Sequence, residues 1–466
     1  MGVSFRCAAS SRGVGRSLAG AGVALALALA LALASMANPT AHRPYAVPPA
    51  HAATRPSGRL LLVRSVRVAG HPIALAVNAQ AGRVFVLTRG ATTGRGRLVG
   101  DMLDVLDART GAPVATVPLM PVRYLGIGTN PASDPTSDAS TVLFAPQALV
   151  MDEVDDRAFV LDAGQFDKGA SAGGGTIRAF DGTTGRPLYT APDAGGPTGA
   201  AVGAPRGAVA VVNYFANTVT VLDARTGGMR RTLARGIGTQ AQVVAVDAAR
   251  GRLTVGSAGA GNAAGGTDGL VSVFDAHGAL LRTGALYNGI PAAAAVDGGT
   301  GRVVLGAPSE HSSIVAVLDP ARGAVVHSLS FAGAGAYPLV VDAPTGYAYV
   351  FGTPNYNGAS GDVVSVIDTR RGRVVRTIAH GVTPGLAVTA VGALDARRRR
   401  VFVVTAAVDA PGAPGNLLVL NARPGDVALT EGLRGGPLVV AVNERAGRLV
   451  VAAANGMIYM FDTTHL

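Results

Sequence analysis

The stretch VVNYFANTVTVLDARTG, residues 211–227, decides the fold of this chain. Two runs rich in valine and threonine flank a short polar loop, and the second run ends at Asp223, shortly before Gly227. Runs of β-branched residues predict strands, and Asp and Gly suit the backbone angles of tight turns between antiparallel neighbours. The stretch therefore predicts two paired strands followed by a tight turn into a third.

The second half of this stretch returns along the chain. An apolar run closed by an Asp, with a Gly soon after, ends at Asp107, Asp181, Asp223, Asp275, Asp319 and Asp368, and weaker copies end at Asn421 and Asp462. Each copy is preceded by two apolar runs joined at an Asp or Asn turn, as in 243–257, and is followed by a fourth short run. We expect the six aspartates to be structural, each accepting backbone N–H bonds in its turn.

Four short strands in each repeat of roughly 40–50 residues predict an all-β fold, a β-propeller of four-stranded antiparallel blades. We count eight blades, with seven as the alternative. The last unit, 437–462, has three strands, and residues 59–68 form an unassigned strand at the start. We expect the N-terminal strand to join the C-terminal blade and close the ring, which removes exposed sheet edges.

Val212, Asn213 and the segment 218–227 resemble the YVTN-type propeller repeat, in which Tyr-Val-Thr-Asn leads into Thr-Val-Ser-Val-Ile-Asp and a Thr-Gly turn. Most other copies keep only the part that ends at Asp. The resemblance covers roughly residues 59–466 and implies an exported propeller of the YncE-like and lactonase-like group, in which seven blades are usual. It implies nothing definite about activity, because propellers host unrelated functions.

The N-terminus predicts export. Arginines precede an apolar run within residues 1–37, which is typical of a signal peptide, with an uncleaved anchor as the alternative. Residues 38–57 predict a Pro/Ala-rich linker, and 58–466 the propeller, in the periplasm, the cell envelope or outside the cell. Cys7 is the only cysteine, so the mature chain has no disulfide. The absence of Trp argues against cofactor sites built on stacked tryptophans.

The long connections predict where function lies. In a four-stranded meander, loops between second and third strands emerge on the same face as connections between blades, and variable loops on a rigid scaffold usually carry binding. The expected ligand-binding residues on this face are Tyr124, Gln147, Asp162, Asp167, Asn213, Tyr214, Tyr356 and Asp362. The acidic turn DEVDD (152–156) and the basic turn ARRRR (396–400) are expected on the opposite face.

Three functions are compatible with the sequence. The first is a monomeric, non-catalytic scaffold that binds a protein, glycan or small molecule, with no cofactor. The second is a lactone hydrolase or lyase, for which Glu310, His311 and Asp268 are the candidate catalytic residues, with a divalent metal at the channel mouth left open. The third is a binder of anionic polymers such as nucleic acid, which the formal charge of +11 favours. Direct membrane contact is expected only through an uncleaved N-terminal segment.

Overall fold

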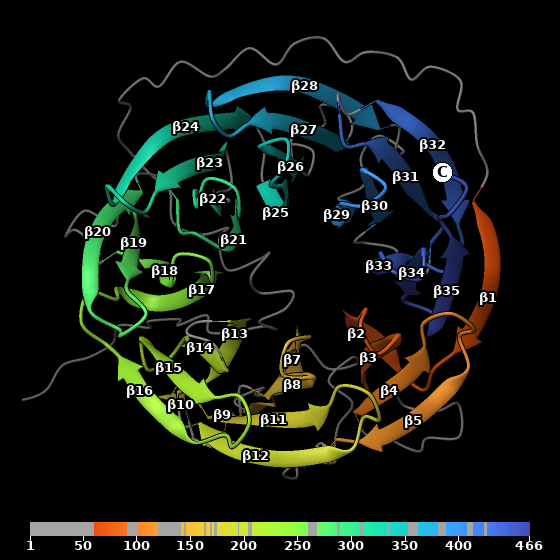
Figure 1. Cartoon of the computed structure of the whole chain (residues 1–466), viewed down its shortest axis with the longest axis horizontal. Coiled ribbons are helices and arrows are strands. Elements are labelled where there is room, and N and C mark those ends of the chain that lie inside the picture. Colours follow the sequence, from red (N-terminus) through yellow and green to blue (C-terminus); the bar gives the residue numbers. More distant parts are fainter. Residues whose placement is uncertain are drawn as a thin grey trace, which may run out of the picture.

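The computed structural model describes residues 60–90, 101–119, 141–143, 146–162, 165–167, 170–171, 175–193, 195–203, 207–259, 268–286, 289–307, 312–332, 336–352, 362–380, 388–407, 413–423 and 426–466. These residues form eight four-stranded antiparallel sheets that stand as blades around a ring (Figure 1), which confirms the predicted all-β propeller and its blade number. No helix long and apolar enough to cross a membrane occurs in these ranges. The signal and linker expected in 1–57 lie outside them.

The first four blades follow the chain in order. Blade 1 contains β2 (His71–Asn78), β3 (Arg83–Arg89), β4 (Met102–Asp107) and β5 (Pro113–Pro118). Blade 2 contains β7 (Pro146–Asp152), β8 (Arg157–Asp162), β11 (Gly175–Asp181) and β12 (Pro187–Asp193). Blade 3 contains β13 (Pro197–Val202), β14 (Ala208–Asn213), β15 (Thr218–Asp223) and β16 (Met229–Leu233). Blade 4 contains β17 (Thr239–Asp247), β18 (Arg252–Ala258), β19 (Gly269–Phe274) and β20 (Leu280–Leu286).

The remaining blades complete the ring. Blade 5 contains β21 (Ala293–Val296), β22 (Val303–Ala307), β23 (Ser312–Asp319) and β24 (Ala324–Ala332). Blade 6 contains β25 (Ala336–Asp342), β26 (Tyr347–Gly352), β27 (Asp362–Asp368) and β28 (Arg373–His380). Blade 7 contains β29 (Val388–Asp395), β30 (Arg400–Ala407), β31 (Gly415–Asn421) and β32 (Val427–Leu433). Blade 8 contains β33 (Pro437–Asn443), β34 (Arg448–Ala453), β35 (Met457–Asp462) and β1 (Leu61–Arg67).

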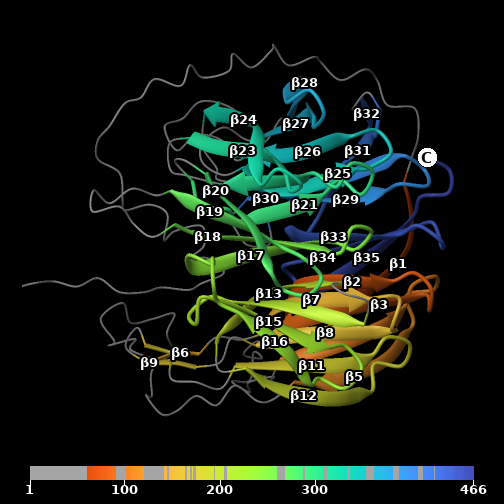
Figure 2. The ribbon, with the colours of Figure 1, turned by 60° about the vertical axis from the view of Figure 1, so that its left-hand side comes forward.

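The ring closes as the sequence predicts. β1 pairs antiparallel with β35, from Leu61 opposite Asp462 to Arg67 opposite Met457. The outermost strand of the last blade therefore comes from the start of the propeller, and the two ends of the ring are held together by one ladder. A small additional sheet of β6 (Thr141–Leu143), β9 (Gln165–Asp167) and β10 (Ala170–Ser171) lies apart from the blades (Figure 2).

The hydrophobic core lies between neighbouring blades. Phe85 and Leu103 of blade 1, for example, pack in one cluster with Val160 and Phe180 of blade 2. The central strands are covered by neighbouring blades on both faces, so second strands such as β14, AVAVVN, appear in the sequence as continuous apolar runs. Third strands such as β15, TVTVLD, keep some alternation. Because apolar side chains must cover both faces of each blade, the chain contains many short valine-rich runs.

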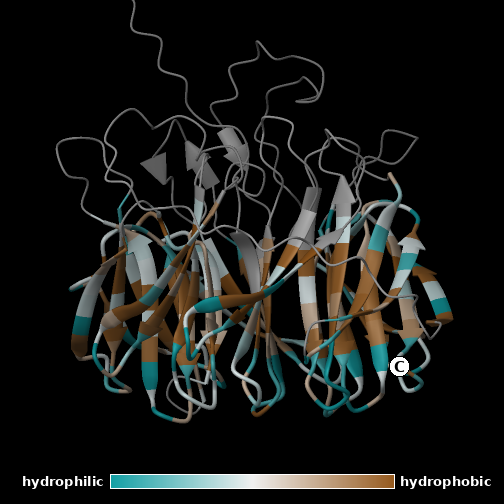
Figure 3. Cartoon of the chain, turned by 90° about the horizontal axis from the view of Figure 1, so that it is seen from above, coloured by the Kyte–Doolittle hydropathy of each residue, from teal (hydrophilic) through white to brown (hydrophobic). Residues whose placement is uncertain are grey.

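The two ends of the ring differ in their connections. Turns between first and second strands, and between third and fourth strands, lie together at one end, the turn face, which Figure 3 shows at the bottom. The opposite end, the loop face, carries the connections between second and third strands, for instance between β3 and β4 and between β26 and β27, and the connections between blades. The strand order therefore places the short turns at one end of the ring and the other connections at the opposite end, as the sequence predicts.

Candidate functional site

The inner strands of the blades carry almost no charge. β2, β7, β13, β17, β21, β25, β29 and β33 lie nearest the axis of the ring (Figure 1). Apart from His71 at the start of β2, charged or imidazole side chains occur in these strands only at their last residue, and Ala, Val and Leu predominate. The described ranges also contain no group of three His, Cys, Asp or Glu arranged to hold a metal ion. A metal at the channel mouth remains a prediction from the sequence.

The six aspartates expected to be structural all accept hydrogen bonds within their turns. Oδ1 of each accepts the backbone N–H of the residue two positions later, at 2.8–3.1 Å, in Asp107, Asp181, Asp223, Asp275, Asp319 and Asp368. A hydrogen bond from Arg230, supported by backbone N–H groups, holds the pKa of Asp223 well below its usual range. Gly227, four residues after Asp223, has φ of 73°, which a glycine adopts without strain. These carboxylates organise the turns.

Much of the predicted binding face lies outside the described residues. This holds for Tyr124 and Tyr356 and for the catalytic candidates Glu310 and His311. Gln147, Asp167 and Asp362 belong to β7, β9 and β27, but the positions of their side chains are not described. The enzyme hypothesis therefore rests on the sequence alone, and the loop face can be built from four predicted residues: Asp162, Asn213, Tyr214 and Asp268.

Asn213 is turned into its blade. Asn213 is only 2% exposed, and its Nδ2 donates to the hydroxyls of Thr218 and Thr220 at 3.1 and 2.7 Å. The amide thus fixes the tight turn from β14 to β15 and does not face solvent. Asp162, at the end of β8, is half-buried and interacts electrostatically with Arg178, whose pKa is lowered by burial and raised again by this carboxylate.

Tyr214 and Phe215 form the tip of this turn on the loop face. Their rings meet edge to face, with centroids 4.9 Å apart and planes at 72°. The N–H of Tyr214 donates to the carbonyl of Gly196 at 3.1 Å, and a Cβ on Gly196 would approach a Phe215 ring carbon to 2.4 Å. Burial raises the pKa of the Tyr214 phenol, although part of its side chain is exposed. The turn thus presents one aromatic side chain in a fixed position.

Hydrogen bonds connect this turn to blades 4 and 5. Asn217 accepts the N–H of Gln240 at 2.5 Å, and the hydroxyl of Thr239 donates to the carbonyl of Gly259 at 3.4 Å. The N–H of Gly259 donates to the carbonyl of Asp268 at 2.7 Å, and Asp268 forms a bridge with Gly289 at the start of blade 5. We call the exposed and half-exposed side chains along this path the blade 3–5 arc; its members are Tyr214, Phe215, Asn217, Thr239, Gln240 and Asp268.

Two members of the arc hold unusual backbone conformations. Asn217 has φ of 54° and Gln240 has φ of 51°. Asn tolerates the left-handed region comparatively well, but Gln does so rarely, and such strain is retained mainly where surrounding contacts or function require it. The side chain of Gln240 is exposed on the loop face, next to the N–H that Asn217 binds.

Two buried acids in blade 1 were not among the predicted residues. Asp101 is 2% exposed, and its Oδ1 accepts the N–H of Gly90 at 2.6 Å. Oδ1 of Asp104 accepts the hydroxyl of Thr116 at 2.6 Å, while its Oδ2 is buried without a hydrogen-bond partner among the described residues. Burial raises the pKa of both carboxyls. The hydrogen bond from Gly90 and the charge of Arg89 lower the pKa of Asp101 by less than burial raises it, and the hydrogen bond from Thr116 does the same for Asp104. Asp104 takes the place that Thr220 holds in blade 3, and no motif marks it.

Replacing Asp104 by Asn should stabilise the protein at neutral pH. Because the folded pKa of Asp104 lies above the unfolded value near 4, its ionisation penalises the folded state once the pH exceeds that value. We expect Asp104→Asn to raise the unfolding midpoint by about 2–4 °C at pH 7, a gain that shrinks as the pH falls toward 4. Thermal unfolding between pH 4 and about 8 measures this.

Asp107→Asn is the matched control, with the opposite sign. Burial alone would raise the pKa of Asp107, but hydrogen bonds from Thr110 and Arg109 and the charge of Arg83 bring it below its usual value. Its ionised form therefore favours folding above the unfolded pKa, and this variant should lose stability at pH 7. A fall in the midpoint of Asp104→Asn at pH 7 would show that the buried carboxylate has a partner that stabilises it.

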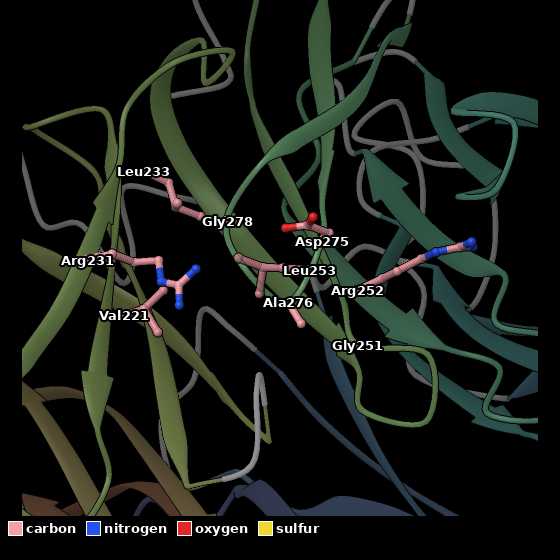
Figure 4. A pocket seen from close by; sticks show the side chains of 9 residues that line it. All are labelled: Val221, Arg231, Leu233, Gly251, Arg252, Leu253, Asp275, Ala276 and Gly278. Carbon is pink, nitrogen blue, oxygen red and sulfur yellow. The ribbon is translucent and has the colours of Figure 1, made fainter.

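Two small cavities lie among the described residues. One lies between blades 3 and 4 and is lined by Arg231, Leu253, Asp275 and their neighbours (Figure 4); its volume is about 10 Å³, enough for one water. The other, of about 150 Å³, lies at β11 and β12 beside Arg178 and Tyr189. Ligand pockets usually measure roughly 300–1,000 Å³. Neither of these two cavities is large enough to enclose a sizeable ligand.

Comparison with known proteins supports the fold and nothing finer. No protein-family model and no curated protein matches the sequence. The structure is similar to the Dos1 propeller, with a TM-score of 0.60 and 12% identity over 87% of this chain and 96% of that one. It is also similar to the C-terminal WD40 domain of Sif2, with a TM-score of 0.57 and 8% identity over 86% and 98%. A third similar structure is the Kuenenia stuttgartiensis hydrazine synthase, with a TM-score of 0.53 and 14% sequence identity over 72% of this chain and 99% of that one.

Proposed function

We propose that this protein is an exported, non-catalytic binding propeller of the YVTN-type, YncE-like group, and that it binds a protein, glycan or small molecule on its loop face. The blade 3–5 arc is the described part of that surface. Export and group membership are inferred from the N-terminal sequence and from the repeat. Membership is independent of the structural neighbours, whose identity to this chain is too low to indicate more than a propeller.

The observation that carries the proposal is the strained, exposed Gln240, which is bound by Asn217 of the turn that also carries Tyr214. A residue other than glycine with positive φ costs on the order of 1–3 kcal/mol, which the contact with Asn217 helps to offset. An aromatic ring and carboxamides presented on a rigid frame are the side chains with which binding surfaces typically combine apolar contact and hydrogen bonding.

The test is a ligand screen with paired variants. Thermal unfolding of the protein with panels of oligosaccharides, peptides and lactones should reveal a ligand, because a ligand at about 100 times its Kd adds roughly 2.7 kcal/mol to the free energy of unfolding. Tyr214→Ala combined with Gln240→Ala should abolish that shift. The control pair, Arg225→Gln with Thr226→Ala, changes exposed residues of the same region of the chain on the turn face and should leave the shift unchanged.

Two results would contradict the proposal. A ligand whose stabilising effect is lost in the control pair but kept in the arc variant would move the binding surface to the turn face. Turnover of a lactone that survives the arc variant and disappears in Glu310→Ala or His311→Ala would replace the scaffold by the enzyme hypothesis.

A further inference from the structure

The turns between first and second strands have one position that requires a left-handed backbone. Six blades place glycine there, with φ between 60° and 76°: Gly82, Gly207, Gly251, Gly301, Gly346 and Gly447. The two exceptions are Asp156 in blade 2, with φ of 53°, and Arg399 in blade 7, with φ of 56°. Glycine avoids the steric cost of this conformation, so the two charged residues are retained against a local preference.

Hydrogen bonds of the Asp156 side chain explain its presence, whereas the side chain of Arg399 forms none with the described residues. Oδ1 of Asp156 accepts the Asn78 amide at 2.6 Å, and Oδ2 accepts the Thr183 hydroxyl at 2.9 Å, so this carboxylate joins blade 1 to blade 2. Arg399 uses its backbone carbonyl to accept the N–H of Ala422, but its exposed guanidinium makes no hydrogen bond or ion pair with any described residue. The backbone contact needs no arginine, so the side chain itself calls for an explanation.

Other exposed arginines surround Arg399 on the turn face. Blade 6 supplies three from the turn between β27 and β28, and blade 7 two from the turn between β29 and β30; we call them the arginine patch, consisting of Arg370, Arg371, Arg373, Arg397 and Arg399. Only Arg371 and Arg397 have carboxylate partners among the described residues, Asp368 at 3.0 Å and Glu444 at 4.0 Å.

The acidic groups of these turns are buried beneath the patch. Asp368 and Asp395 are 4% and 0% exposed, and each holds its own turn through backbone N–H bonds. Their charges are also engaged by Arg371 and Arg398. Carboxylates that are already hydrogen-bonded cannot rotate out to neutralise Arg370, Arg373 and Arg399, so the outer surface of these two turns is strongly positive.

The turn face is polarised across the ring. The turn 152–157 of blade 2 contains four acidic residues and one arginine, and Val154 in its middle is 85% exposed. Blade 2 lies across the axis from blade 6, because three blades lie between them on either side in a ring of eight (Figure 1). The edge of the turn face at blade 2 therefore carries more acidic groups than the edge at blades 6 and 7.

We propose that the arginine patch binds a linear phosphodiester polymer through its phosphates. Guanidinium groups match phosphate oxygens with paired N–H donors, and several adjacent arginines match successive phosphates. A flat anionic surface wide enough to meet the whole turn face would also meet the acidic turn of blade 2, whereas a narrow chain can cross blades 6 and 7 alone. The patch contains no aromatic side chain, so it offers no stacking for bases and we expect no sequence preference. This proposal is independent of the loop face.

The first test compares two triple variants with equal loss of charge. The probe is a fluorescent DNA duplex of about 24 base pairs, titrated with the full-length protein at several salt concentrations. Arg370→Gln, Arg373→Gln and Arg399→Gln together should weaken binding at least about tenfold in low salt and make the dependence of log K on log salt shallower by about 2–3. The control, Arg109→Gln, Arg186→Gln and Arg225→Gln, removes exposed turn-face arginines of blades 1–3 and should stay within about twofold of the wild type.

Equal losses in the two triple variants would overturn the proposal, since general positive charge would then account for binding. Absence of duplex binding at low salt would overturn it too. So would displacement of the duplex by a polysaccharide carrying only carboxylates at the same charge concentration. A second duplex of different sequence should bind with equal affinity; a clear preference would contradict recognition through phosphates alone.

The second test uses the strain at Arg399. Arg399→Gly should raise the unfolding midpoint by about 2 °C, because glycine relieves the left-handed conformation, and should weaken duplex binding by about threefold. Arg399→Lys keeps the charge and the strain, so it should leave the midpoint unchanged and retain most of the affinity. If Arg399→Gly destabilises the protein, or stabilises it without any loss of binding, the residue is not kept for its charge.

Discussion

A chain that begins at residue 69 should unfold about 10 °C below one that begins at residue 59, because it lacks the strand that closes the ring. β1 is the outermost strand of blade 8 and pairs with β35 along its whole length. The deletion removes this ladder together with two buried anchors, Leu60 in the cluster between blades 7 and 8 and Val68 in the cluster between blades 8 and 1. Burial of each is worth about 1.5–3 kcal/mol.

Calorimetry of the two chains makes the comparison, and the chain beginning at residue 59 is the control for loss of the preceding residues. The shortened chain also exposes the edge of β35, and unpaired strand edges promote association between molecules. We therefore expect it to aggregate on heating at concentrations where the control stays monomeric. Midpoints within about 2 °C of each other would show that contacts other than β1 carry the closure.

The fold was predictable because one device is repeated in every blade. The turn that follows Asp223 recurs in a recognisable form after Asp107, Asp181 and Asp368, and in each the aspartate binds the backbone N–H two residues later. A local turn of this kind depends on a few neighbouring residues, so it can be recognised without knowing the rest of the structure. The last unit has three strands and the start of the propeller has one unassigned strand, which together predict how the ring closes.

The candidate site was less predictable because side-chain direction depends on distant packing. Asn213 and Tyr214 are adjacent and both polar, yet the amide of Asn213 is turned into the blade by Thr220, while Tyr214 remains partly exposed at the tip. Asp104 is buried because blades 8 and 1 meet over it, which no local motif indicates. The strain at Gln240 is a backbone angle, and nothing in its neighbouring sequence announces it.

Arg399 is a different case, because the sequence contained a usable signal. Aligning the turns 78–83, 247–252 and 443–448 with 395–400 shows glycine at the fifth position in the first three and arginine in the last. The basic run ARRRR stands out by its charge, but the missing glycine carries more information, since it shows that a residue is retained at a conformational cost. The importance of that cost became clear only with the backbone angles of all eight turns.

Tyr349 should be the single side chain whose loss costs the most stability. It is completely buried on β26 in the cluster that joins blades 6 and 7, and its hydroxyl donates to the carbonyl of Ala422 at 2.5 Å. Tyr349→Ala leaves a cavity the size of an aromatic ring between two blades and should lower the free energy of unfolding by about 3–5 kcal/mol. For a propeller of this size the midpoint should fall by about 4–6 °C.

Tyr349→Phe separates the hydrogen bond from the packing. It keeps the ring but deprives the buried carbonyl of Ala422 of its donor, which should cost about 1–3 kcal/mol. Burial raises the pKa of Tyr349, an effect that Asp342 and Tyr347 increase and Arg399 reduces. Since its folded pKa exceeds the unfolded value near 10, the stability that Tyr349 contributes is complete below pH 10 and declines as the pH rises toward the folded pKa.

The difference in midpoint between the wild type and Tyr349→Phe should therefore be constant up to about pH 9.5 and should narrow at higher pH. Tyr189→Phe is the matched comparison, because its hydroxyl donates to the carbonyl of Ala224 at 2.6 Å in the same way, and burial raises its pKa to about 12. Tyr189 is only half-buried, so we expect a smaller loss there. If Tyr349→Phe matched the wild type at pH 7, water would have to reach the carbonyl of Ala422, and the seam between blades 6 and 7 would be looser than its packing indicates.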